Sequence, residues 1–185
     1  MGLFLNDPGA LVGDRLTANT SVTNTTTETT LYTLTIPPDT LQTNRKLRLE
    51  AQLAVSDAPT TLSSRTLTLR MKYGAVTIAT GTMLTSDSDG ASVNAIGTSV
   101  GYVLMALLTA DGSTAAQIAH MAVIGPGIYS GLNGALLGSF STTTTARGAG
   151  AVDSTLEKAL AITAQWSQAG SGRTVTIEAA TVELV

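Results

Sequence analysis

Side chains that could carry chemistry are scarce in this chain. It contains one histidine, His120, and no cysteine. One histidine cannot form a histidine-based metal cluster within a subunit, and a chain without cysteine forms no disulfide, zinc–thiolate site or thiol nucleophile. Copies of His120 could meet around an axis in a symmetric oligomer and bind a metal. The simpler interpretation is a turn or a partly buried strand position.

The best match to a catalytic motif is the G-x-S-x-G segment at residues 97–101, centred on Ser99. Asp111 and His120 follow in the chain order of a hydrolase triad. However, the flanking residues are typical of strands, and the spacing from Ser99 to His120 leaves no room for the intervening elements of an α/β hydrolase. We therefore predict that the chain is not an enzyme and has no cofactor.

The loop that contains Asp87 and Asp89 resembles the start of a calcium-binding loop. The twelfth position of that loop is Thr98, where an EF-hand requires a bidentate glutamate. The other acidic residues are dispersed, and Glu178 and Glu183 lack the pairing that a glycosidase needs. We expect a solvated loop and no bound metal.

Composition excludes several classes of partner. Only 12% of the residues are charged, about half the usual share, and the net charge is −3. The densest cationic group, residues 45–48, is expected to be a solvated face, so no nucleic-acid partner is predicted. No window holds the ~18 apolar residues of a membrane span, and the N-terminus does not resemble a signal peptide. We therefore expect a soluble protein without a membrane partner.

Alternating apolar and polar residues dominate the rest of the sequence. The pattern is clear at residues 31–36, 46–55 and 66–73, and threonine supplies much of the outward face. Residues 101–112 are apolar on both faces, which predicts a central strand buried on both sides. The segment 114–124 could be a helix or a strand, and its neighbours favour a strand.

Turn signals divide these runs. The sequence predicts that residues 125–127 end a strand and that 141–150 form a surface loop. A change of parity between Ala179 and Val182 indicates a β-bulge in the last strand. In all, eight or nine strands without helices predict an antiparallel β-sandwich, most plausibly a jelly roll.

We expect two segments in the chain: an N-terminal arm at residues 1–19 and a single sandwich domain at 20–185. The arm carries apolar residues between proline and glycine, and it could be held by its own domain or by a partner. Its candidate contact residues are Leu3, Phe4, Leu5, Leu11 and Val12.

Four stretches carry a family resemblance: SVTNTTTETTLYTLTIPPDTL, RKLRLEAQLAV, SRTLTLRMKYGAVTIATGT and LAITAQWSQAGSGRTVTIEAATVELV. Together they resemble a recurrent β-sandwich of tailed-bacteriophage virion proteins, over about residues 20–185. The resemblance implies a jelly-roll trimer on the outside of the particle and no catalytic residue.

Such domains act as capsid decoration (cement) proteins, as head fibres or as the tips of tail fibres. This chain lacks coiled-coil heptads and β-helix repeats, which favours a decoration protein on the outer capsid surface. Its partners would be copies of itself and the major capsid protein, with the arm gripping the shell. The alternative is a fibre domain that binds a host receptor or glycan, which predicts exposed aromatic side chains. Only Tyr129 and Trp166 are candidates for that role.

Overall fold

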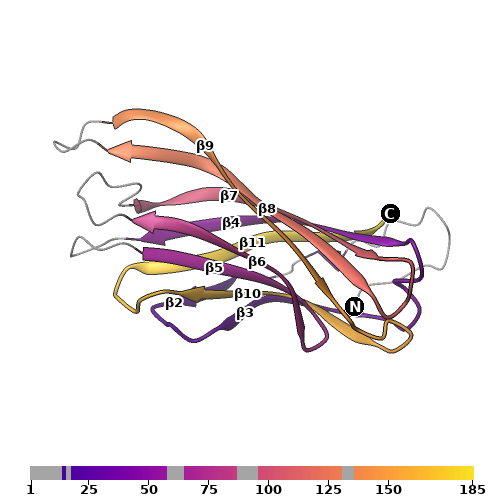
Figure 1. Ribbon diagram of the computed structural model, residues 1–185. Helices are drawn as coiled ribbons and strands as arrows, with labels where there is room; N and C mark the ends of the chain where they lie inside the picture. The colour runs from indigo at the N-terminus through magenta and orange to yellow at the C-terminus, as the bar shows by residue number, and fades with distance from the viewer. Residues whose placement is uncertain (1–13, 16–17, 58–64, 87–95, 131–135) are drawn as a thin grey trace.

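The computed structural model describes residues 14–15, 18–57, 65–86, 96–130 and 136–185. Within these ranges the chain forms eleven β-strands and no helix, in two stacked sheets (Figure 1). None of the described residues belongs to a helix that could cross a membrane.

The larger sheet has seven antiparallel strands. Its order is β1-β11-β4-β7-β8-β9, and β2 also pairs with β11. The strands are β1 (Asp14–Arg15), β2 (Thr20–Thr23), β4 (Lys46–Asp57), β7 (Ile96–Ala110), β8 (Gln117–Ser130), β9 (Leu136–Gly150) and β11 (Arg173–Leu184).

The smaller sheet has four antiparallel strands in the order β3-β10-β5-β6. They are β3 (Thr29–Ile36), β5 (Arg65–Tyr73), β6 (Val76–Ser86) and β10 (Lys158–Trp166). The turn between β5 and β6 contains Gly74, whose φ of +59° suits glycine. The predicted antiparallel sandwich of the jelly-roll class is therefore confirmed.

One hydrophobic core fills the space between the sheets. Alternate residues of each strand point inward, so β4 shows strict alternation of exposed and buried side chains over most of its length. Leu49 and Leu53 of β4 are as deeply buried as Leu69 and Met71 of β5 on the opposite sheet. The residues of this core form one cluster and come from the described chain between Val22 and Val182.

Two predicted turns are strands instead. β8 continues through Pro126, and the threonine-rich segment 141–150, expected as a loop, forms most of β9. The proline is tolerated because β7 pairs with β8 only as far as Ile124, so one edge of β8 is open at Pro126. Threonine is β-branched and suits a strand even where no alternation of apolar residues indicates one.

Other predictions fared better. The ambiguous segment 114–124 is a strand from Gln117 onward. The last strand has a bulge, but its register shift against β4 lies between Ile177 and Ala179, a few residues before the predicted place between Ala179 and Val182. The prediction of eight or nine strands was low, because it missed β9 and the short pairings of β1 and β2 with β11.

The two sheets approach most closely where β9 crosses β6. A side chain at Gly148 would place its Cβ 1.8 Å from the carbonyl oxygen of Ile78, a backbone atom that cannot turn aside. Glycine is therefore required for this contact between the sheets. By contrast, a Cβ at Gly101 would meet nothing within 4 Å.

We predict that Gly148→Ala destabilises the fold by about 1–3 kcal/mol, because the strands must separate to admit the methyl group. Gly101→Ala is the matched control and should be neutral or slightly stabilising, by up to about 1 kcal/mol. Urea unfolding monitored by Trp166 fluorescence measures both. Equal stability of the two variants would contradict the close approach of β6 and β9.

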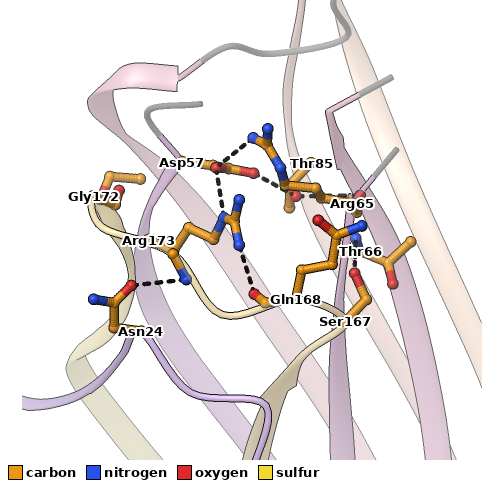
Figure 2. A network of polar contacts seen from close by, with 11 residues as sticks. Asn24, Asp57, Arg65, Thr66, Thr85, Ser167, Gln168, Gly172 and Arg173 are labelled. Carbon is orange, nitrogen blue, oxygen red and sulfur yellow. Dashed lines mark hydrogen bonds and ion pairs between the residues drawn. The ribbon is translucent and has the colours of Figure 1, made fainter. Parts of the chain in front are cut away.

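A buried ionic network ties the two sheets together at the end of the sandwich opposite the C-terminus (Figure 2). Oδ1 of Asp57, on β4, accepts bonds from Arg65 Nη1 of β5 at 3.1 Å and from Arg173 Nε of β11 at 3.3 Å. Its Oδ2 accepts a bond from Thr85 Oγ1 of β6 at 3.0 Å. Asp57 is wholly buried, so one carboxylate links two strands of each sheet.

Removing this carboxylate takes away the ion pairs that it makes with two buried arginines, which typically costs about 3–5 kcal/mol. We therefore predict a loss of that order in the unfolding free energy of Asp57→Ala. Asp111→Ala, at an exposed turn position, is the control and should change stability by less than about 0.5 kcal/mol. Chemical denaturation compares them, and a small effect at Asp57 would show that the network is not structural.

Candidate binding surface

The residues of the hydrolase motif do not assemble into a triad. Ser99 lies within the continuous strand β7, whereas a nucleophile elbow requires a strand-to-helix turn. His120 on β8 pairs with Leu107, eight residues along β7 from Ser99. That separation corresponds to about 27 Å along the strand. The motif at residues 97–101 is therefore part of a strand.

The candidate metal ligands are not brought together in the part of the chain that the structure describes. His120 is exposed, and its cross-strand neighbours are Leu107 and Arg147. No group of three histidine, aspartate or glutamate side chains in the described residues could hold a metal ion. Asp87 and Asp89 lie outside those residues.

The predicted capsid-contact residues also lie outside the described part of the chain. They are Leu3, Phe4, Leu5, Leu11 and Val12. The arm is first described at Asp14 and Arg15, which form β1 and pair with Val182 and Thr181 at the edge of the larger sheet. At this point the arm is held by its own domain.

The most unusual surface of the described residues is the outer face of the larger sheet. β7, predicted to be buried on both sides, is covered on one side only. Val103 is 43% exposed and Met105 41%, and Ile124 of β8 is 36% exposed. Among the described residues no second layer covers this face, so the apolar residues that suggested a central buried strand are exposed there.

These side chains form one continuous patch. Val103 pairs with Ile124, Met105 with Ala122, and Leu107 with His120. Directly opposed residues have Cβ atoms about 4.5–5.5 Å apart, and alternate residues of a strand share a face. We name the group Val103, Met105, Leu107, Ala122 and Ile124 the β7–β8 patch. A contiguous apolar patch with a polar rim marks an interaction site more often than scattered exposed residues do.

The β7–β8 patch has relief. A hollow of about 390 Å³ lies over Leu107 and the small side chain of Ala122, and it reaches from Arg48 of β4 to Thr145 of β9. A second hollow of about 320 Å³ lies on the other side, bordered by Val103 and by residues of β4 and β11. Val103 therefore borders one hollow, and Met105 borders the other.

Charged residues border the patch on both sides. On the β4 side, Arg48 donates hydrogen bonds to Glu183, which raises the pKa of the guanidinium. Glu50, opposite Met105, has only a 3.9 Å contact with Arg48. On the β9 side, Arg147 is exposed and makes no ion pair with the described residues. Among the described residues, the border thus carries one weakly paired carboxylate, Glu50, and one guanidinium without an ion pair, Arg147, on opposite sides.

The outer face of the smaller sheet is different in character. It is lined mainly by threonine and alanine, and the side chain of Glu28 also lies on it. The Glu28 carboxylate accepts hydrogen bonds from Lys72 Nζ and from Thr163 Oγ1, both at 2.8 Å, and Arg70 lies 3.6 Å away. The hydrogen bond from Lys72, followed by that from Thr163, lowers the pKa of Glu28. This face is polar and internally paired.

A third feature is the end of the sandwich that carries the C-terminus. Large apolar side chains are exposed there, Val76 at 37%, Leu156 at 55% and Val185 at 54%. Beneath them the loops are joined by buried bonds, since Ser154 Oγ donates to the carbonyl oxygen of Leu41 at 2.7 Å. β1 pairs with Val182 and Thr181 near the end of β11, so Asp14 and Arg15 lie near this end of the sandwich.

Aromatic side chains do not contribute to the described surface. Trp166, a predicted glycan contact, is 1% exposed, and Tyr32, Tyr73 and Tyr102 are buried as well. Burial raises the pKa of Tyr73 to about 12. Tyr129 lies in β8, but its side chain is not among those described. The prediction that Trp166 is available at the surface was wrong.

The fold and this surface define an all-β, two-sheet domain of jelly-roll type with an uncovered sheet face. No family model matches the chain, and no curated protein matches it.

Solved structures that match this chain at a low level include three of different kinds. Peanut lectin with a nonamer peptide is 13% identical, with a TM-score of 0.40 over 100% of this chain and 95% of the lectin. The CBM2 module of the evolved Dit of Lactobacillus casei BL23 phage J-1 is 12% identical, with a TM-score of 0.23 over 78% and 68% of the two chains. An alginate lyase from Klebsiella pneumoniae is 11% identical, with a TM-score of 0.24 over 76% and 59%. A likeness at this level carries no information on function.

The β7–β8 patch was not recognised in the sequence, although its signal was present. Periodicity shows that residues 101–110 are apolar on both faces, but it does not show whether a second layer covers the outer face. The polar residues opposite them on β4 and β9 were the available clue, because a doubly buried sheet would have apolar residues there too.

The Glu28 network predicts a dependence of stability on pH. The pKa of Glu28 in the folded state lies below its ordinary 4.5, so its contribution is present above that pH and is lost as the pH falls through the folded-state pKa. We expect Glu28→Gln to lower stability at pH 7 by up to about 1 kcal/mol, and the difference to shrink in acid. Exposed Glu157→Gln is the control. A difference that is constant from pH 7 to pH 3 would contradict the network.

Proposed function

We propose that the protein is a non-enzymatic structural protein of a tailed-phage virion. In this proposal it is a capsid decoration protein on the outer surface of the head, and it binds across capsomer junctions as a homotrimer. The observation that carries the proposal is the uncovered β7–β8 patch, which needs a protein partner. The sequence resemblance to phage virion β-sandwiches supports a phage virion as the assembly to which the protein belongs.

The distribution of surfaces supports this role. A decoration protein has to contact copies of itself and the shell at once, and this chain has two separate apolar surfaces. One is the β7–β8 patch, and the other is the C-terminal end with Leu156 and Val185 exposed near the base of the arm. Symmetric trimers fit sites of local threefold symmetry. A protein that binds only the assembled shell stabilises it by mass action, without any chemistry.

The alternative is a domain of a head or tail fibre that binds a host receptor or glycan. Sugar rings commonly stack on exposed aromatic side chains, and the four aromatic residues whose side chains are described are buried. The described surface therefore gives this alternative no specific support.

Addition of the purified protein to heads that lack it should give saturable binding and raise the temperature at which the heads release DNA. Leu156→Asp should weaken binding by at least tenfold, because it places a charge on an apolar contact. Asp111→Asn, near the same end but polar, is the control variant.

Two further results bear on the proposal. A variant without residues 1–12, which keeps β1, should bind heads more weakly if the arm grips the shell. Heads that ignore the intact protein, together with its retention on host cells or on a glycan array, would overturn the decoration role in favour of the fibre alternative.

A further inference from the structure

We infer that the hollow over Leu107 and Ala122 binds an acidic, apolar peptide segment of a partner protein. One large apolar side chain of the segment fills the hollow, and a carboxylate next to it pairs with Arg147. The inference rests on the proposed function, in which the β7–β8 patch meets a protein partner, and it specifies the chemistry of the segment that the partner supplies.

The hollow suits an apolar side chain. Its volume of about 390 Å³ lies at the lower end of the range of binding pockets, about 300–1,000 Å³. Met105, Leu107 and Ala122 line it. Ala122 lies between the longer side chains of His120 and Ile124 on the same face of β8, so it leaves room at that position. An apolar side chain placed there removes apolar surface of both partners from water, which is the main source of association energy.

The charges beside the hollow favour an anion. The strands β7, β8 and β9 contain no acidic residue, and their only basic side chains are His120 and Arg147. These two residues are exposed and directly opposite each other on β8 and β9. Arg147 makes no ion pair with the described residues, and an imidazole donates an N–H in either protonation state. A carboxylate of the partner can therefore accept hydrogen bonds from both.

The opposite border determines the direction of the segment. Arg48 of β4 lines the hollow, but it donates its hydrogen bonds to Glu183. Glu50, two residues further along β4, lines the second hollow and repels a carboxylate placed there. The acidic residue of the segment is therefore expected over β9, next to Arg147, with the apolar residue over β7 and β8.

The extent of the exposed surface favours a peptide over a small anion. The β7–β8 patch continues from the hollow to Val103 and Ile124, which are 43% and 36% exposed. These residues are directly opposite each other and lie two positions along the strands from Met105 and Ala122, about 7 Å away. A ligand of the size of the hollow would leave them uncovered, whereas a peptide segment has further side chains that can cover them.

Titration calorimetry with designed peptides tests the inference on the intact protein. The probe is a capped pentapeptide with phenylalanine at its centre and two aspartates on each side. One control peptide has lysine in place of aspartate, and the other has serine in place of phenylalanine. We expect the probe to bind at least tenfold more tightly than either control, and added salt to weaken its binding.

Matched variants locate the bound peptide. Ala122→Leu fills the hollow without a change of charge and should weaken binding of the probe by at least tenfold. Arg147→Gln should weaken it by about fivefold, whereas Lys46→Gln, which removes an exposed cation of β4 outside the hollow, should change it by less than twofold. Circular dichroism checks that each variant is folded. Binding that is unchanged in both Ala122→Leu and Arg147→Gln would overturn the inference.

Other outcomes separate the inference from the proposed function. If the probe does not bind, or binds no better than the lysine peptide, the inference fails, and uptake of the protein by heads would still support the decoration role. If the probe binds as expected but heads ignore the protein, the peptide site stands and the decoration role fails. Self-association that is abolished in Ala122→Leu would assign the hollow to a second copy of the chain and overturn the inference.

Discussion

The pleat of a β-strand imposes the constraint on which this structure depends. Successive side chains point to opposite faces, so a strand that is apolar throughout must either be covered twice or expose half of its apolar side chains. β7 is such a strand, and its inner half, with Leu104 and Leu108, is buried against the smaller sheet. Its outer half, with Val103 and Met105, has no such cover in the part of the chain that the structure describes. In the proposed function, a protein partner covers that half.

The rest of the fold holds this face in place. Asp57 joins strands of both sheets at one end, and the bonds of Ser154 join the loops at the other. Gly148 lets the sheets close along β6 and β9. With both ends and one side fixed, the central strands of the larger sheet present a preorganised surface, and association need not pay for ordering the backbone. The outer face of the smaller sheet is polar, and Glu28 is already paired with Lys72 there. This face therefore gains little free energy from contact with a partner.

Local pattern was enough to predict most of the architecture. The alternation in β4 and β5, the turn at Gly74 and the bulge before Val182 follow from short-range physical rules that need no knowledge of neighbours. The prediction missed β9 because threonine stands where an alternating strand would have apolar residues. It ended β8 too early because Pro126 usually ends a strand, and only the register shows that β8 no longer pairs with β7 at that position. The β7–β8 patch was missed for a deeper reason. Whether Met105 is buried depends on which layers exist, and this is a property of the assembled sheets and not of the segment.

Solvent access to Met105 in the associated protein tests the central claim most directly. The chain contains no cysteine, so Met105→Cys introduces a unique thiol whose alkylation rate reports exposure, and Thr80→Cys reports the opposite sheet. If a protein partner covers the patch, alkylation at position 105 will slow by at least tenfold when the protein is bound to heads, while alkylation at position 80 stays constant. An unchanged rate at position 105 in the bound protein would contradict the account.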